Sequence, residues 1–479
     1  MYDLYLKPFG LLRAGAWLEA GGWDTVFVDA LDYEDRASAA LLGPPKRRAD
    51  GTGKFFRQRL PVPPVLKSAY AKKTPEDSPP KHFARYGIIG ESFRERLLRA
   101  SRSASPRRPD LILITSGMTY WYPGLAEAAE TCRALFPGTS VAVGGVYASL
   151  MPEHCKKTSG ADAVVSGGGG ELAAVLERLG LPVPPGEYPE FPPAAASAWK
   201  DAGVLRLNTG CPFRCDYCAS HLLSPRFRAG SAEAAFQAFT AFMDAGIRNF
   251  AFYDDALLAA KEEVFLPFLE RVTERFGPAD AADGPRFYLP NAVHIQSLDS
   301  RTANLMRRAG FQEIRMGFES SSPGFHKEHT PSGAKFNPES FPDSLRALRA
   351  AGFPAGSLSV YILAGLPGQR AEEVEESIHS VRESCPQAGS KDIRIRLAEF
   401  SPVPGSALWE KSAGLCRYPL AEEPLFHNNS LFPMEWEHFT RRDLLRLKSL
   451  AASVGRNGIE GARSGRASGG TPEKPGFLR

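Results

Sequence analysis

The sequence predicts an α/β protein in which an N-terminal Rossmann-like parallel sheet domain precedes a partial (β/α)6 TIM-like barrel. Apolar segments of strand length alternate with amphipathic segments of helix length along most of the 479 residues. A Pro- and Ala-rich stretch, "LPVPPGEYPEFPPAAASAW", interrupts this alternation and marks a boundary between two domains. Strands that alternate with helices form parallel sheets, and ligands bind at the carboxyl ends of such strands.

The composition is typical of a globular protein in a reducing compartment. Hydrophobic residues make up 43% of the chain and charged residues 23%, and no apolar run approaches the roughly 20 residues of a membrane helix. A net charge of +4 neither requires nor excludes a nucleic-acid partner. Seven cysteines form no disulfide framework, and no secretory signal is seen. We therefore expect a cytoplasmic protein that uses its thiols for chemistry.

The first domain is expected to span residues 1–190, with a basic, Pro-rich insertion at about 42–108. We predict a strand at residues 25–31, "TVFVDAL", and further strands in "PDLILITSG", "TSVAVGGVYAS" and "ADAVVSGGGGELAAVLERL". The strand ends and turns that face a ligand in such a sheet include Ser116, Gly144, Gly145 and Gly169. The basic residues of the insertion could bind a phosphate group, but such residues more commonly form a solvated surface. They are Lys54, Arg57, Arg59, Lys67, Lys72 and Lys73.

The barrel is expected to span residues 200–410. Its six predicted strands are "VLRLNTG", "RNFAFYDD", "FYLPNAV", "EIRMGFES", "SLSVYILAGLPG" and "DIRIRLAEF", each followed by a helix or a turn. A C-terminal helical extension is predicted at 411–454. The last segment, 455–479, lacks apolar periodicity and is predicted to be a disordered tail.

Three of the cysteines, Cys211, Cys215 and Cys218, fall within eight residues with the spacing C-x3-C-x2-C. A structural zinc site needs four ligands, so His221 would have to complete a Cys3His site, which is the conservative alternative. Three thiolates around a 4Fe–4S cluster would instead leave one iron without a protein ligand, and that iron could chelate a small molecule.

This spacing resembles the signature of the radical SAM superfamily, and further motifs follow in the family's order. The resemblance implies a 4Fe–4S cluster on the three cysteines that reductively cleaves S-adenosylmethionine (SAM) to methionine and a 5′-deoxyadenosyl radical. It also implies SAM contacts. These are Tyr217, which precedes the last cysteine; Asp254 and Asp255 in "FAFYDDALL"; Glu319 in "IRMGFESS"; and Gly365 and Pro367 in "YILAGLPG". The alternatives are a helix cap for one aspartate, a solvated carboxylate for Glu319 and an ordinary turn for "GLPG".

A parallel α/β domain ahead of such a barrel resembles the branch of this superfamily with a cobalamin-binding domain. "VAVGGVYAS" and "VVSGGGGE" resemble that domain's Gly-rich strand end and turn. Two features depart from it: no D-x-H-x-x-G motif is present, and Gly168 replaces an acidic residue of the turn. The domain therefore either binds cobalamin or keeps a structural or substrate-gripping role. The family's first strand is missing before "YDLYLKPFGLL", so we expect translation to start upstream and the recorded chain to be less stable than an extended one.

The leading interpretation is a radical SAM enzyme, with methyl transfer as one outcome if cobalamin binds. It implies a small-molecule or peptide substrate and an electron donor such as flavodoxin or ferredoxin, with no membrane partner. The alternative from another class is a non-catalytic iron–sulfur redox or sensor protein. An RNA-modifying methylthiotransferase needs a second cysteine triad, which the sequence lacks, so no nucleic-acid partner is expected. His294, Arg315 and Arg396 could contact substrate, with core or salt-bridge roles as alternatives.

Overall fold

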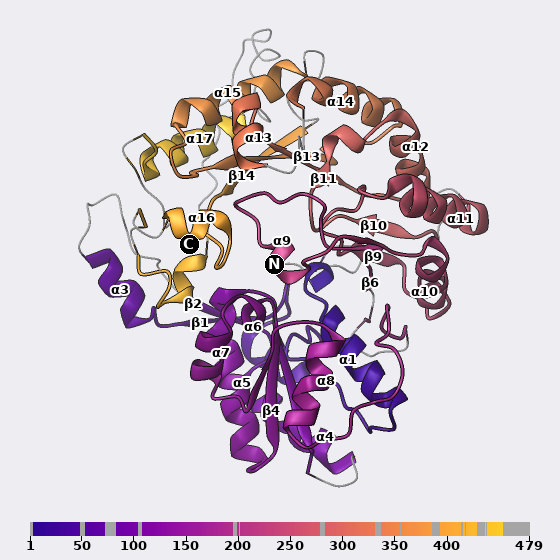
Figure 1. The fold of residues 1–479 in the computed structure, drawn as a ribbon, viewed down its shortest axis with the longest axis vertical. Coiled ribbons are helices and arrows are strands. Elements are labelled where there is room, and N and C mark those ends of the chain that lie inside the picture. Colours follow the sequence, from indigo (N-terminus) through magenta and orange to yellow (C-terminus); the bar gives the residue numbers. More distant parts are fainter. Residues whose placement is uncertain are drawn as a thin grey trace, which may run out of the picture.

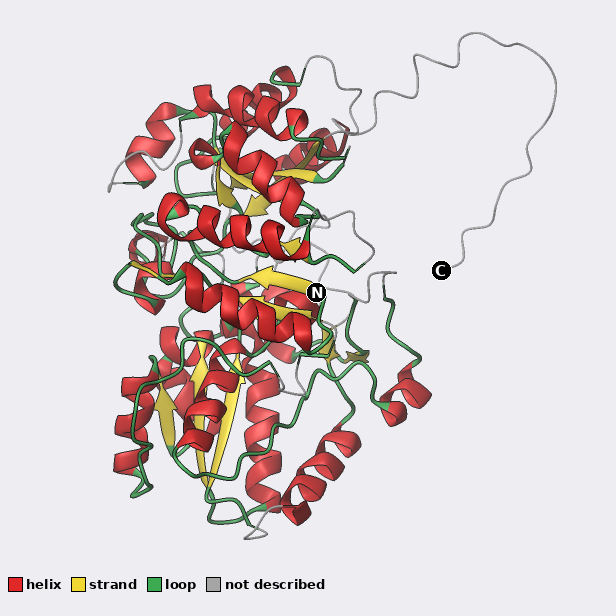
Figure 2. Cartoon of the chain, turned by 90° about the vertical axis from the view of Figure 1, so that its right-hand side faces the viewer, coloured by secondary structure: helices red, strands yellow, loops and turns green. Residues whose placement is uncertain are grey.

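A computed structural model gives the fold of the chain (Figures 1 and 2). It describes residues 3–47, 53–71, 83–103, 108–194, 199–200, 202–277, 283–330, 337–354, 356–385, 393–412, 415–416, 418–428, 436 and 438–453. None of the helices in these ranges is both long and apolar enough to cross a membrane. The predicted tail at 455–479 lies outside the described residues.

The N-terminal domain is built on a three-stranded parallel sheet of order β3-β4-β5, as the alternation of apolar segments predicts. Helices cover both faces of this sheet (Figure 1), which its continuously apolar strands require. The strands are β3 (Leu111–Ser116), β4 (Ser140–Gly145) and β5 (Ala163–Val165). One face packs on α4 (Gly90–Ser103), α5 (Tyr122–Leu135) and α7 (Pro152–Ser159), and the other on α1 (Phe9–Ala20) and α8 (Gly169–Arg178).

The strand predicted at residues 25–31 is wrong, because this segment has no regular secondary structure. Two of its apolar side chains, Phe27 and Val28, pack against hydrophobic clusters instead. Val28 packs against the cluster of Leu97, Cys132 and Phe136, which belong to α4 and to the end of α5. Among the described residues β3 pairs with β4 alone, so the segment forms no ladder with the sheet.

The insertion contains a pair of antiparallel strands, β1 (Arg57–Leu60) and β2 (Phe83–Tyr86). The helix α3 (Pro64–Ala71) lies between these strands in the sequence, and α2 (Arg36–Leu42) precedes the insertion. The side chains of Lys54, Arg57, Arg59 and Lys67 are exposed, as on a solvated surface, whereas Lys72 and Lys73 lie outside the described residues. Because α4 packs on the sheet, we propose that the insertion ends before this helix.

All six predicted barrel strands are present and parallel, and the third, "FYLPNAV", is divided into two short strands, β10 and β11. One sheet has the order β10-β9-β6 and the next the order β11-β12-β13-β14, with a bridge from Phe287 to Phe311 between them. The strands are β6 (Ala202–Leu205), β9 (Asn249–Phe252), β10 (Arg286–Tyr288), β11 (Val293–His294), β12 (Ile314–Glu319), β13 (Leu358–Ala364) and β14 (Ile393–Glu399). The helices form an outer arc in Figure 1: α10 (Ala232–Asp244), α11 (Leu266–Phe276), α12 (Ser300–Ala309), α14 (Phe341–Ala350), α15 (Ala371–Glu383) and α17 (Arg441–Ser453).

Side chains alternate between the two faces of the barrel wall. The outer face carries aromatic rings against the helices; Phe252, for example, stacks on Phe311 with 5.5 Å between ring centroids. On the inner face, Leu4 of η1 (Asp3–Tyr5) packs against Ala202, Ala251 and Tyr288. The segment η1 therefore lies inside the barrel wall.

A C-terminal segment ties the barrel to the N-terminal domain. It runs from α16 (Ala407–Ser412) to η6 (Pro424–His427). The buried His427 ring contacts Leu420 O through Nε2 (2.8 Å) and Thr119 Oγ1 through Nδ1 (2.9 Å). Since a carbonyl oxygen only accepts, Nε2 carries the proton and the Thr119 hydroxyl donates to Nδ1. Tyr122 of α5 also donates to Glu423 Oε1 (3.0 Å). Hydrogen bonds from Thr119 and Tyr122 therefore join the N-terminal domain to the C-terminal segment.

Stability is expected to fall as pH falls below about 6.5, because of His427. Burial lowers the pKa of His427 from 6.5 to about 4. Between these values the unfolded chain binds a proton that the folded chain does not, so up to ~3 kcal/mol of stability is lost on acidification through this window. Denaturant unfolding between pH 4 and pH 8 measures this slope. His427→Gln should flatten the slope and the exposed control His379→Gln should not; an equal slope in all three proteins would contradict the prediction.

Candidate functional site

The three clustered cysteines lie on one loop between β7 (Asn208–Thr209) and α9 (Ser220–Leu223), near the centre of Figure 1. Gly210 starts this loop at φ +76°, where a side chain would also meet the carbonyl oxygens of Arg226 and Ser224. Cys215 is buried, and Cys211 and Cys218 are partly exposed. The Cys218 N–H donates to Cys215 O (3.1 Å), which closes the turn that presents the thiols.

The spacing of the three thiols suits a multi-iron cluster. A 4Fe–4S cluster spans several ångströms and takes separated thiolates from one loop. A zinc ion would instead need His221 as its fourth ligand, with all four ligand atoms drawn to within about 4 Å of one another. The cluster on Cys211, Cys215 and Cys218 therefore stays a prediction, with the Cys3His site as its alternative.

The loop is anchored by residues that the sequence analysis did not select. His329, at the end of α13 (Pro323–His329), contacts both carboxylate oxygens of Asp216 through Nδ1 (3.0 and 3.1 Å). The Asp216 N–H donates to His329 O (3.2 Å), and its carbonyl accepts from Leu408 N (3.0 Å). Thr330 Oγ1 lies 3.7 Å from Cys215 Sγ. No motif marks these residues, because 113 residues separate Asp216 from His329.

Asp254 and Asp255 follow β9 but have different surroundings. Asp254 is 2% exposed and accepts backbone N–H bonds from Asn208 (2.6 Å) and Leu207 (3.1 Å). Burial raises its pKa to about 7, against the lowering effect of these bonds. Asp255 is partly exposed and accepts from Ser220 Oγ (3.2 Å), which itself lies 3.2 Å from Cys218 Sγ. Asp254 therefore supports the start of the cysteine loop, and Asp255 is the carboxylate beside the thiols.

Tyr217 of the cysteine loop lies near Glu319. Burial raises the pKa of Tyr217, and the nearby Glu319 and Cys215 add to this shift. Glu319 ends β12 at φ +61° and is 8% exposed. A non-glycine residue in this left-handed region is strained, and such strain is typical of functional sites. The register of β12 against β13 shifts between Gly317 and Glu319, which re-aims this side chain.

Gly365 and Pro367 form the turn that follows β13, and Gly365 has φ +90°. The buried side chain of Gln369 fills this turn: its Oε1 accepts from Gly365 N (2.7 Å) and Leu366 N (3.2 Å). These are backbone groups of the segment expected to contact adenine. The sequence analysis missed Gln369, which follows "GLPG" directly and therefore could have been found.

Ser116, Gly144 and Gly145 are brought together at the carboxyl end of the N-terminal sheet. Gly145 pairs with Ser116 and has φ +93°, and a Cβ atom there would lie 2.4 Å from Ser116 O. The following helix α6 (Val146–Leu150) contacts α9, so this end of the sheet faces the cysteine loop.

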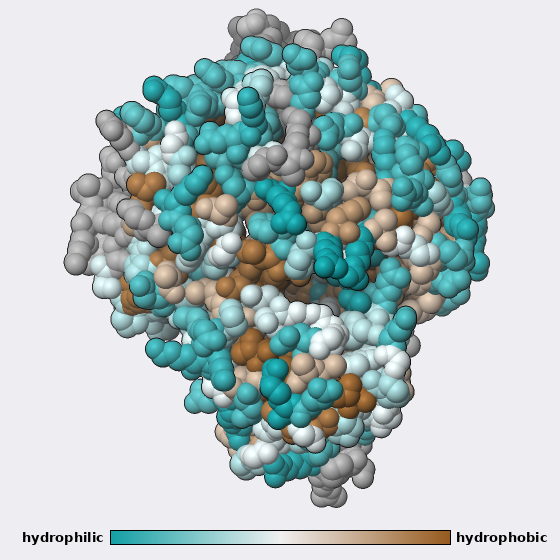
Figure 3. Space-filling model, viewed as in Figure 1, coloured by the Kyte–Doolittle hydropathy of each residue, from teal (hydrophilic) through white to brown (hydrophobic). Residues whose placement is uncertain are grey.

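The side chains next to this interface are apolar and exposed. Met118 follows β3, and Leu222 and Leu223 lie on α9, each more than a third exposed. Figure 3 shows hydrophobic residues gathered near the middle of this face, between the barrel and the lobe that contains β4. Gly169 differs from the other predicted glycines, because the ring of Tyr188 fills its space at 2.5 Å from a built Cβ. Packing of the linker therefore explains that glycine.

The three candidate substrate residues have different surroundings. Arg315 is committed to Glu313 Oε1 (2.5 Å) and to the Tyr5 hydroxyl (2.8 Å), which matches the salt-bridge alternative. His294 is buried, with its ring 4.7 Å from that of Phe213 in the cysteine loop. Arg396 is exposed on the face of β14 opposite α17, which contacts this strand. Its role with an anionic substrate stays a prediction.

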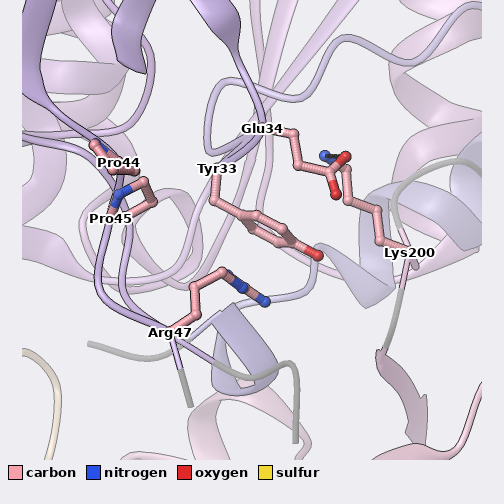
Figure 4. Close-up of a pocket in the computed structure, with 6 residues that line it drawn as sticks. All are labelled: Tyr33, Glu34, Pro44, Pro45, Arg47 and Lys200. Atoms are coloured by element: carbon pink, nitrogen blue, oxygen red, sulfur yellow. Dashed lines mark hydrogen bonds and ion pairs between the residues drawn. The ribbon is translucent and has the colours of Figure 1, made fainter. Parts of the chain in front are cut away.

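A separate pocket of about 490 Å³ lies beside the linker and contains none of the predicted site residues (Figure 4). The Tyr33 ring lies beside two cations, the Arg47 guanidinium at 3.4 Å and the Lys200 ammonium at 4.6 Å. Lys200 is itself paired with Asp32 and Glu34. The pocket is lined by Tyr33, Glu34, Pro44, Pro45, Arg47 and Lys200.

Comparison with known proteins gives a family match over the barrel. The Radical SAM superfamily matches residues 205–381, which include the cysteine loop. An uncharacterized methyltransferase of Pyrococcus horikoshii is 26% identical over 252 residues, which are 51% of this chain and 47% of that protein. The chain therefore spans about half the length of this relative.

Solved structures resemble both domains. The radical S-adenosylmethionine methyltransferase TsrM from Kitasatospora setae, with cobalamin and a 4Fe–4S cluster bound, has a TM-score of 0.56 and 16% identity, over 75% of this chain and 82% of that chain. A second structure of TsrM, with tryptophan substrate and a SAM analogue, has a TM-score of 0.57 and 16% identity, over 82% and 86%. The likeness extends beyond the barrel into the N-terminal domain and shows a shared fold. Residues 205–381 are thus similar to the Radical SAM superfamily.

Proposed function

We propose that this protein is a radical SAM enzyme that carries a 4Fe–4S cluster on Cys211, Cys215 and Cys218. The observation that carries this proposal is the set of three thiols on one anchored loop, with carboxylates on both sides and no fourth cysteine beside them in the sequence. Such a cluster supplies the electron that splits the sulfonium bond of SAM and gives a 5′-deoxyadenosyl radical for hydrogen abstraction.

The surrounding residues would bind and orient SAM. The Asp255 carboxylate lies beside Cys218 through Ser220, so it is placed to accept hydrogen bonds from the SAM ammonium group. Glu319, strained at the end of β12, is placed to accept from the ribose hydroxyls, and Tyr217 would cover the adenine. The turn with Gly365 and Pro367 would contact the adenine through its backbone, which Gln369 Oε1 holds in place by accepting from Gly365 N and Leu366 N.

We further propose that the N-terminal domain binds cobalamin and that the reaction is a methyl transfer. Ser116, Gly144 and Gly145 leave a strand end without bulky side chains, and exposed apolar residues border the interface. The cobalamin-bound structural relative is a methyltransferase, and the sequence relative carries the same name. Cobalamin would supply the methyl group, whereas the protein would position the substrate in the barrel. Gly169, which packs against Tyr188, is set aside as a cofactor contact.

We propose the domain limits that the sequence predicts, with one change: the insertion ends before α4. A cytoplasmic setting with a reductant such as flavodoxin or ferredoxin fits a cluster that must be reduced. The substrate would be a small molecule or a peptide that enters the barrel.

Anaerobic reconstitution with iron and sulfide tests the proposal. We expect about four irons per chain, release of 5′-deoxyadenosine with dithionite and SAM, and a corrin spectrum that is retained through gel filtration after cobalamin is added. A cluster without SAM cleavage would favour the non-catalytic iron–sulfur protein. Zinc in place of iron would overturn the proposal, and loss of the corrin spectrum would overturn the cobalamin part alone.

Asp255→Asn is expected to weaken SAM binding by roughly 10-fold or more, because a charge-assisted hydrogen bond to the ammonium group is lost. The affinity is measured on the oxidised cluster, where SAM is not cleaved. The exposed Asp244→Asn at the end of α10 removes the same charge far from the loop and should bind SAM as the wild type does. Equal affinities in both variants would rule out this role for Asp255.

A further inference from the structure

The segment that ends α13 packs directly on the cysteine loop. Thr330 is only 3% exposed, and its hydroxyl lies 3.7 Å from Cys215 Sγ. No other side-chain hydrogen bond of Thr330 is found among the described residues. A buried hydroxyl without a partner is costly, so the thiol of Cys215 explains why a hydroxyl is tolerated here.

The direction of this hydrogen bond follows from the proposed function, on which the inference rests. A cysteine that ligates iron is deprotonated, and its sulfur can only accept. The Thr330 hydroxyl must then donate to Cys215. Hydrogen bonds to cluster sulfurs set the reduction potential, because they stabilise the additional negative charge of the reduced state.

We infer that Thr330 is a positioning residue for Cys215 and that its hydroxyl raises the reduction potential of the cluster. The cysteine loop is fixed next to Thr330, because the adjacent His329 contacts the Asp216 carboxylate through its ring and accepts from Asp216 N through its carbonyl. These contacts place the donor and the ligand on two segments that are joined at two further points, so the geometry is reproducible.

Ser220 offers an instructive contrast at the neighbouring thiol. Its hydroxyl lies 3.2 Å from Cys218 Sγ and 3.2 Å from Asp255 Oδ1. A single hydroxyl proton serves one acceptor at a time, and the carboxylate is the stronger acceptor. Within the described ranges no carboxylate competes for the Thr330 hydroxyl, whose contact is with Cys215.

The test is a redox titration of the reconstituted full-length protein, followed by electron paramagnetic resonance without SAM. Thr330→Val removes the hydroxyl and keeps the volume, and we expect its cluster potential to shift to more negative values. Thr330→Ser keeps the hydroxyl and should restore the wild-type potential. A change in fold alone would not restore the potential in the serine variant.

Unchanged potentials in Thr330→Val would overturn the inference and leave the proposed function standing, because the cluster itself would still be seen. Thr330→Ala is the second hydroxyl-free variant, in case valine disturbs the packing. If valine and alanine both lose the cluster while serine retains it, the hydroxyl contact to Cys215 is supported. A wild-type protein without a cluster would overturn the proposed function, and this inference with it.

Discussion

Replacement of Cys211, Cys215 or Cys218 by alanine is expected to abolish SAM cleavage, with 5′-deoxyadenosine falling to background in each variant. The three thiols lie on one loop, and each would hold a different iron of the cluster. The sequence around this loop holds no fourth cysteine to replace a lost one, because the next is Cys385. Loss of any ligand therefore leaves two irons without protein thiolates, and the open iron that chelates SAM is no longer defined.

Cys385→Ala is the matched control, because Cys385 is also partly exposed but lies at the end of α15. It should retain iron and activity. Iron content and 5′-deoxyadenosine are measured on the reconstituted variants, and circular dichroism checks that each remains folded. Full activity in any one of the three loop variants would remove that residue from the cluster.

Gly145→Ala is expected to destabilise the N-terminal domain by about 3 kcal/mol. Gly145 has φ +93° and ψ −173°, a region open to glycine almost alone. A Cβ atom would also lie 2.4 Å from Ser116 O, a backbone atom of the neighbouring strand that cannot move without breaking the β3–β4 ladder. Strain and steric overlap therefore act together.

Gly168→Ala is the control for this substitution, since its φ is −88° and a Cβ atom there meets nothing within 4 Å. Urea unfolding followed by tryptophan fluorescence measures both variants. We expect a clear drop in the midpoint for Gly145→Ala and a change within about 0.5 kcal/mol for Gly168→Ala. Equal midpoints would mean that the end of β4 relaxes without cost.

The alternation of apolar segments was sufficient to predict the parallel sheet and all six barrel strands, because buried parallel strands are continuously apolar. The cysteine spacing was sufficient to locate the candidate site. Periodicity failed at residues 25–31, where Val28 packs on α4 and α5 but the segment has no strand partner among the described residues. A pattern of apolar residues reports burial, and burial alone does not specify a ladder.

The anchors of the site were beyond reach of the sequence because they depend on distant partners. Asp216 and His329 meet only once the barrel brings α13 onto the cysteine loop. Gly169 fits the cofactor motif, yet its neighbour is Tyr188 of the linker. Arg315 was one of two equivalent arginines until the structure showed it bound to Glu313 and Tyr5.

The placement of η1 inside the barrel wall has a consequence for the order of folding. Leu4 O accepts from Tyr253, 249 residues later, and Tyr5 donates to Glu313, 308 residues later. During synthesis η1 is made well before these partners, so its contacts must wait for most of the barrel. Closing such long loops is entropically costly, so we expect η1 to take its place late in folding.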